Sequence, residues 1–277
     1  MKQRSHRPGV KVAIAILGFA LVALYLFPFA MVLVNSVKPR LAIVADPLAL
    51  PAKADFSNYV NAFRLMRFPR AFWNSLGVCV SSVVLIVVFS SLWAYYLVRW
   101  KNLINRIVFF VLIASMIVPF QALMIPFVSI YGGLGLLNSK WLLSVFYLGF
   151  GCALATFMYH GFIKSIPLEL EEAAMIDGAT KPMIFIKIIF PMLTTMTSTI
   201  CILDVLWVWN DFLLPSLVLV SEEKRTLPLS TFYFFGKYTS NYGTAMAALV
   251  LSILPVIIFY LAMQRKILQG VVDGAIK

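Results

Sequence analysis

The chain has few charged residues. Only 12% of its 277 residues are Asp, Glu, Lys or Arg, far below the roughly 25% of a soluble globular domain. Hydrophobic residues make up 62% of the chain and the mean hydropathy is +0.93. This composition excludes an ordinary soluble fold and predicts a protein that is solvated by lipid.

Paired cysteines and catalytic motifs are also lacking. Cys79, Cys152 and Cys201 all lie inside apolar runs without metal-ligand spacing, so we predict buried thiols and neither a disulfide nor a metal site. The sequence contains no nucleophile elbow and no His-Glu-x-x-His pair. Residues 235–238, Phe-Gly-Lys-Tyr, lack the leading glycine and the hydroxyl of a phosphate-binding loop. We therefore expect a chain that is not an enzyme, has no catalytic residues and holds no cofactor of its own.

The basic charge does not indicate a nucleic-acid-binding protein. The formal net charge is +12, but the lysines and arginines fall at the ends of apolar runs, where they can anchor to lipid headgroups. A stripe of basic residues interleaved with aromatic ones, as nucleic-acid binding requires, is absent from the sequence outside these runs. The expected surroundings are the bilayer and its headgroups.

Six apolar runs are long enough to cross a membrane. A helix needs about 20 apolar residues to span the hydrocarbon. The runs lie at about 12–36, 71–98, 105–131, 141–163, 193–219 and 243–263. The first run is too long for a cleaved secretory signal, so we expect it to remain as a helix. The sequence predicts an all-α polytopic membrane protein with a transmembrane domain over residues 12–264.

The distribution of basic residues predicts the orientation. A basic N-terminus, residues 1–11, and a basic tail, residues 265–277, are both expected in the cytoplasm. The external loop, residues 37–70, is basic as well, so the charge rule is not fully obeyed. Within this loop, residues 56–66 have apolar side chains at helical spacing and predict a short helix. It could rest on the bilayer or contact an external partner.

A polar segment, residues 164–191, separates the fourth run from the fifth. A charge at the bilayer centre costs roughly 2.5–3.5 kcal/mol on insertion scales, so the segment is expected in water on the cytoplasmic side. Pro167 and Gly178 predict the start and the stop of a short helix, and Pro182 predicts a second helix that ends at Pro191. The charged residues are Glu169, Glu171, Glu172, Asp177, Lys181 and Lys187.

The first of these short helices has the features of a docking surface. Ala173 and Ala174 form a small-residue face that another protein can approach closely, while Glu172 and Asp177 offer hydrogen-bond acceptors to a partner. An ordinary charged loop is the alternative interpretation. The residue types alone do not decide between the two.

The spacing in this segment resembles a known signature. Glu-Ala-Ala, three residues, Gly, nine residues, Ile, one residue, a hydrophobic residue and Pro follow one another from Glu172 to Pro191. This is similar to the cytoplasmic signature of the membrane subunits of binding-protein-dependent ABC importers. In that family the segment is the coupling helix, which docks on the ATPase subunit. The resemblance implies this role for Glu172, Ala173, Ala174, Asp177 and Gly178.

Further stretches resemble the carbohydrate branch of that family. They are residues 58–59, 74–75, 119–126, 209–212 and the ending from residue 264 to the C-terminus. The resemblance extends over nearly the whole chain. The group they resemble contains the second membrane subunit of the maltose transporter.

The resemblance implies a type I ABC importer permease in a bacterial or archaeal inner membrane. Its expected partners are a homologous membrane permease subunit, two ATPase subunits that bind ATP and Mg, and an external solute-binding protein that delivers a sugar or oligosaccharide. The expected mechanism is alternating access. Import of a different solute is one alternative, and a stand-alone secondary carrier or channel is another.

Polar and aromatic residues within the spans are candidates for the solute pathway. An ionisable residue inside a span is a functional candidate by default, and indole rings with nearby hydrogen-bonding groups suit sugar rings. The candidates are Gln121, Asp204, Trp207, Trp209, Asn210 and Asp211. The last five are expected on one continuous helix. A tryptophan belt with a helix-packing carboxylate is the alternative interpretation.

Overall fold

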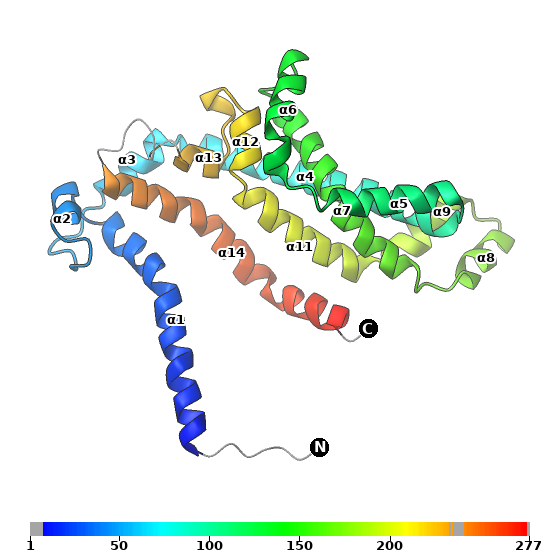
Figure 1. Cartoon of the computed structure of the whole chain (residues 1–277), viewed down its shortest axis with the longest axis horizontal. Helices are drawn as coiled ribbons and strands as arrows, with labels where there is room; N and C mark the ends of the chain where they lie inside the picture. Colours follow the sequence, from blue (N-terminus) through cyan, green and yellow to red (C-terminus); the bar gives the residue numbers. More distant parts are fainter. Residues whose placement is uncertain (1–7, 233, 235–240, 276–277) are drawn as a thin grey trace. The chain divides into compact units, whose positions relative to one another are not determined.

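The computed structural model describes residues 8–232, 234 and 241–275. All regular elements in this part of the chain are helical (Figure 1). The predictions for residues 1–7, 235–238 and 276–277 lie outside the described residues. From residue 265 onward only the backbone is described.

Four helices are long and apolar enough to cross a membrane by themselves. They correspond to the first, second, fourth and sixth predicted spans. They are α1 Pro8–Ser36, α4 Phe68–Arg99, α7 Lys140–Ile163 and α14 Tyr242–Ala275. The prediction of long helices at these places is confirmed.

Two bent helix pairs overlap the two remaining predicted spans. In the third span, α5 Leu103–Ser115 and α6 Phe120–Gly133 meet at 102°. Pro119 precedes α6, and a proline disfavours helical backbone in the residue before it, which explains the break. A second bent pair, Lys181–Met192 and α11 Thr194–Asn210, meets at 74°. Of this pair only α11 falls within the predicted fifth span, because Lys181–Met192 belongs to the segment that was predicted to lie in water. If each pair is one span, the described residues contain up to six spans, as predicted.

The predicted end of the fifth span was wrong. We expected a helix from 193 to 219, but α11 ends at Asn210, and Asp211 has an extended backbone with φ −71° and ψ 131°. The Leu213 amide donates to Asp211 Oδ1 at 2.8 Å, so the carboxylate caps the turn that leads into α12, Leu213–Val218. Pro215 lies in this separate short helix. Beyond it lie a 3-10 turn, Glu222–Lys224, and α13, Leu227–Phe232.

The chain divides into two compact units, and the first comprises the N-terminal part to Phe68 together with Thr231–Leu254. It contains α2 Arg40–Ala45 and α3 Ser57–Leu65, the short helix that residues 56–66 predicted. Asn58 ties the unit together, because its amide donates to Ser36 O at 3.0 Å and to Lys38 O at 2.9 Å. The Thr244 hydroxyl reaches Asn58 Oδ1 at 3.5 Å. The first residue of the 58–59 stretch is therefore structural.

The second unit, Pro69–Ser230 with the chain from Pro255 onward, holds the helices that form both candidate sites. Small residues allow α4 and α7 to approach closely: Ser81 Oγ lies 2.6 Å from Ser144 Oγ. A Cβ added at Gly151 of α7 would lie 2.7 Å from Ile86 Cδ1 of α4, closer than side chains tolerate. Close packing over small residues is how helices associate in lipid. The Tyr159 hydroxyl of α7 donates to Thr197 Oγ1 of α11 at 2.9 Å. This bond links α11 to the packed pair α4 and α7.

Candidate functional site

The predicted docking helix is α8, Glu169–Ile176. Its first turn carries three acidic residues, which the positive end of the helix dipole stabilises. Gly178 has a φ of +85°, a conformation in which a side chain would be strained. The Gly178 amide donates to Met175 O and the Ala179 amide to Ala174 O. The predicted stop at Gly178 is confirmed.

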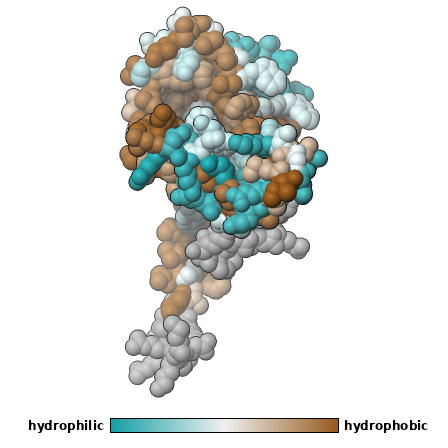
Figure 2. All heavy atoms as spheres, turned by 90° about the vertical axis from the view of Figure 1, so that its right-hand side faces the viewer, coloured by the Kyte–Doolittle hydropathy of each residue, from teal (hydrophilic) through white to brown (hydrophobic). Residues whose placement is uncertain are grey.

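The predicted coupling residues lie mostly on the surface of α8. Glu172, Ala173, Asp177 and Gly178 are exposed, and Ala174 is half-buried. Ile176 next to them is 86% exposed and adds an apolar group to this surface. Figure 2 views this end of the second unit and shows hydrophilic atoms gathered around scattered hydrophobic ones. The exposed part of α8 therefore offers small, apolar and acidic groups together.

Glu171 departs from the prediction that the charges of this segment lie in water. It is only 4% exposed. Arg99 Nε donates to Glu171 Oε1 at 2.6 Å, and the Tyr95 hydroxyl donates to Oε2 at 2.7 Å. Arg99 Nη2 also donates to Ile166 O at 3.2 Å. These bonds attach the first turn of α8 to the C-terminal end of α4.

Sequence reasoning missed the role of Glu171 because it treated all charges of the segment alike. One signal was present: Tyr95 and Arg99 are four residues apart, so they lie on one face of the second predicted span. Two hydrogen-bond donors at the end of a span call for an acceptor. Glu171, in the first turn of α8, accepts from both.

The chain after α8 is anchored by apolar residues. α9, Lys181–Ile184, continues into a π-helical turn, Phe185–Ile189, and then into α10, Phe190–Met192. The predicted helix thus runs to Met192 rather than ending at Pro191. Ile184 and Phe185 are buried, and the Phe185 ring lies 5.2 Å from the Tyr95 ring. α8 is consequently held on both sides, by an ion pair before its exposed face and by apolar packing after it.

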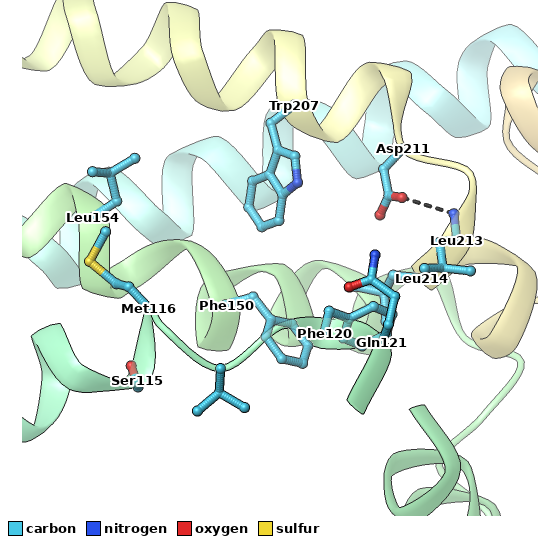
Figure 3. A pocket seen from close by; sticks show the side chains of 11 residues that line it. Ser115, Met116, Phe120, Gln121, Phe150, Leu154, Trp207, Asp211, Leu213 and Leu214 are labelled. Carbon is cyan, nitrogen blue, oxygen red and sulfur yellow. Dashed lines mark hydrogen bonds between the residues drawn. The ribbon is translucent and has the colours of Figure 1, made fainter. Parts of the chain in front are cut away.

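A cavity of about 400 Å³ lies beside the break of the third span. Gln121, Trp207 and Asp211, which are half of the solute-pathway candidates, line it (Figure 3). Phe120 and Phe150 add aromatic rings to the lining. Trp207 and Asp211 come from the end of α11, whereas Gln121 lies in the first turn of α6. The bend between α5 and α6 and the early end of α11 create this mixed polar and aromatic space.

The polar groups of this cavity differ in how firmly they are held. Asp211 Oδ2 accepts a hydrogen bond from the Tyr147 hydroxyl at 2.8 Å, and Oδ1 caps Leu213. The Trp207 ring lies edge-on to Tyr147, with centroids 5.4 Å apart, and remains 40% exposed. Gln121 is exposed and its side chain has no hydrogen-bond partner in the described part of the chain. A fixed carboxylate, an indole face and an available amide are groups that orient a polar ligand.

The other three candidates, Asp204, Trp209 and Asn210, lie outside this cavity. Trp209 packs edge-on to Phe72 at 5.8 Å and lines a separate apolar cavity of about 230 Å³. Asp204 is 6% exposed, and its Oδ2 has no hydrogen-bond partner among the described residues. Asn210 donates to Leu206 O at 2.7 Å, within its own helix. None of the three lines the 400 Å³ cavity, so the predicted set is not one cluster.

Spans that are broken around a polar cavity are characteristic of membrane transport proteins. The family described as "Binding-protein-dependent transport system inner membrane component" matches residues 86–272. The chain belongs to this family. The matched range includes α8 and all residues that line the 400 Å³ cavity.

Individual relatives match over nearly the whole chain. The probable starch degradation products transport system permease protein AmyC of Thermoanaerobacterium thermosulfurigenes is 42% identical, over 96% of this chain and 97% of its own length. The multiple sugar-binding transport system permease protein MsmG of Streptococcus mutans is 37% identical, over 92% of each chain. A solved bacterial ABC transporter involved in the import of the acidic polysaccharide alginate superimposes with a TM-score of 0.78 at 27% identity, covering 96% of this chain and 98% of that one.

Proposed function

We propose that the chain is the membrane permease subunit of an ATP-driven importer that translocates a sugar or oligosaccharide by alternating access. The carrying observation is α8, a helix whose signature residues are mostly exposed while its root, the first-turn residue Glu171, is bonded to Arg99 of the α4 span. The full-length similarity to permeases named for starch degradation products and multiple sugars supports the substrate class.

The proposed complex contains this chain, a homologous membrane subunit, two ATPase subunits and an external solute-binding protein. ATP and Mg bind to the ATPase subunits. α8 docks on one ATPase subunit, so α8 and both chain termini lie on the cytoplasmic side, and α3 lies on the external side. The family description, which names a binding-protein-dependent system and an inner membrane component, supports the solute-binding protein and the membrane location.

The contacts of α8 give each side of the helix a task in coupling. Ala173 and Ala174 allow close approach of the ATPase subunit, and Glu172 and Asp177 accept hydrogen bonds from it. Gly178 provides the backbone turn that ends the docking surface. Movement of the ATPase subunit then passes through Glu171 into Arg99 of α4. The ion pair suits this task, because the docking face and the span move as one body.

The solute is proposed to contact Gln121, Trp207 and Asp211 in the cavity beside the third span. Trp207 offers an aromatic face to a sugar ring, and Asp211 and Gln121 offer hydrogen bonds to hydroxyl groups. Asp204, Trp209 and Asn210 have packing roles in this proposal, because none of them lines the cavity.

Two substitutions on the exposed face of α8 test the coupling role. Glu172→Lys reverses a charge at the docking surface, and Gly178→Asp places a side chain where φ is +85°. Each is expected to abolish solute uptake and solute-stimulated ATPase activity while the amount of inserted protein stays unchanged. Normal transport in both variants would refute the docking assignment.

A reconstitution separates this proposal from a self-sufficient carrier. Liposomes that contain the purified chain alone should not accumulate radiolabelled maltooligosaccharides under an ion gradient, whereas the complete complex with ATP should. Uptake by the chain alone would support a secondary carrier or channel instead. Growth on single sugars after deletion of the gene then identifies the substrate.

A further inference from the structure

An apolar groove runs along the C-terminal part of α4, beside the segment that follows α8. Its volume is about 560 Å³, and its lining includes Leu92, Tyr96 and Trp100 of the α4 side and Phe185 and Ile186 of the opposite side. The lining extends from Val88 to Trp100, a distance of about 18 Å at 1.5 Å per helical residue. The groove is therefore long, narrow and apolar.

One end of the groove carries aromatic rings and a positive charge. The rings of Tyr96 and Trp100 stack with centroids 5.1 Å apart, and Lys181 Nζ lies 4.6 Å from the centroid of the Trp100 ring. Lys181 is the one ionisable lining residue besides tyrosines, and it has no carboxylate partner in the described part of the chain. The nearby acid Glu171 is bound to Arg99 and Tyr95. A free ammonium group at the mouth of an apolar groove favours an amphipathic ligand with an anionic end.

The groove also has the depth profile of a lipid site. Tryptophan and tyrosine gather where membrane spans meet the water interface, and lysine attracts anionic headgroups there. Tyr96 lies in the last turn of α4, Trp100 follows that helix directly, and Lys181 of α9 lies against the Trp100 ring. Val88 and Leu92 lie about two to three turns before Trp100 in α4. With α4 as a membrane span, this order of residues suits a headgroup at the charged end and an acyl chain at the apolar end.

We propose that this groove binds an anionic phospholipid of the surrounding bilayer. An acyl chain lies along Leu92, Phe185 and Ile186, and the phosphate lies against Lys181 and Trp100. A helix of a second subunit fits less well, because a helix of 10 Å diameter occupies roughly 1,400 Å³ over the same 18 Å. The inference requires only that the spans lie in a bilayer and does not depend on docking by α8.

The site is connected to the docking helix through one side chain. Tyr95 lines the groove, and its hydroxyl holds Glu171 at the root of α8. A lipid in the groove therefore packs against a residue that fixes α8. Anionic lipid should make the root of α8 more resistant to proteolysis than zwitterionic lipid does.

The test measures lipid retention and does not use transport. The full chain, purified with its partner subunits, is reconstituted in nanodiscs of phosphatidylcholine and photoactivatable phosphatidylglycerol. Crosslinked peptides and co-purified lipids are identified by mass spectrometry. Phosphatidylglycerol is expected to crosslink to the end of α4 and to α9.

Matched variants locate the site. Lys181→Ala is expected to lower phosphatidylglycerol crosslinking about fivefold, the factor that corresponds to the roughly 1 kcal/mol of one basic residue at an anionic surface. Lys187→Ala removes an exposed lysine six residues further on and should leave crosslinking unchanged. Leu92→Trp keeps the charge but fills the groove, and it should also reduce phosphatidylglycerol crosslinking there.

Several results would overturn the proposal. Equal phosphatidylglycerol crosslinking in the wild type, Lys181→Ala and Leu92→Trp would show that the groove holds no lipid. Equal losses in Lys181→Ala and Lys187→Ala would show unspecific attraction to the surface. Crosslinks from groove residues to the second membrane subunit, in place of lipid, would identify a protein interface.

Discussion

Glu171 and Glu172 are neighbours on α8, yet the first is buried against α4 and the second is exposed. Loss of Glu171 leaves a buried guanidinium and a buried hydroxyl without their acceptor. Loss of Glu172, which is exposed, leaves no buried polar group without a partner. The difference teaches that one turn of helix combines a fixed root with a free surface, and that each can be changed without the other.

Glu171→Ala should have the largest effect on stability. It leaves Arg99 unpaired in a site where the arginine side chain is only 13% exposed, and breaking a buried pair costs about 3–5 kcal/mol. Glu172→Ala should change the free energy of unfolding by less than about 0.5 kcal/mol. Thermal unfolding of the purified chain in detergent measures both. Similar losses in the two variants would mean that the root and the surface of α8 are not distinct.

A double substitution sharpens the same comparison. Arg99→Met with Glu171→Leu removes both charges, and a buried ion pair replaced by apolar residues is often neutral or stabilising. The double variant should therefore recover most of the stability that Glu171→Ala loses. Its solute-stimulated ATPase activity reports whether coupling needs the ionic bond itself or only a rigid root. A double variant as unstable as the single one would show that Glu171 acts through other groups.

The cavity offers a second pair of held and free groups. Tyr147→Phe removes the hydroxyl that donates to Asp211, and a hydrogen bond to a charged group contributes about 1.5–3 kcal/mol. Unfolding should occur at lower temperature, and the transport KM should rise because Asp211 is less firmly held. Gln121→Ala, which breaks no protein hydrogen bond, should raise KM without lowering stability. An unchanged KM in both variants would exclude the cavity from the solute pathway.

The smallest expected effect on stability is at Ile176. Its side chain is 86% exposed, so Ile176→Ser should leave the free energy of unfolding within about 0.5 kcal/mol of the wild type. Association with the ATPase subunit should nevertheless weaken if this apolar residue is covered in the complex. Co-purification at graded salt concentration measures the change. Met183, 43% exposed on the following helix, provides the control substitution Met183→Ser.

Much of this architecture could be predicted from the sequence, because long apolar runs and helix-stop residues act locally. The spans α1, α4, α7 and α14 follow from hydropathy, and Gly178 predicted the end of α8. The buried role of Glu171 could not be predicted from hydropathy, because its partners, Arg99 and Tyr95, are more than 70 residues away in sequence. The end of α11 was also missed, because the apolar run continues beyond the break at Asp211.

Sequence reasoning could predict only in part which of the solute-pathway candidates lie together. Trp207 and Asp211 are four residues apart and share a side of the chain, whereas Trp209 between them points elsewhere. A helical period of 3.6 residues already separates these positions. Which of the two sides borders a cavity depends on the bend between α5 and α6, and the local sequence of α11 carries no information about that bend.

The π-helical turn Phe185–Ile189 fixes the length of the connection between α8 and α11. Its hydrogen bonds span one residue more than those of an α-helix. Removal of a single residue here would restore regular winding, turn everything that follows by roughly 100° and shorten the path by about 1.5 Å. The extra residue thus sets the rotation of the following chain about the helix axis. Relatives that differ by one residue in this turn should present Phe190 and the start of α11 at a different angle to α8.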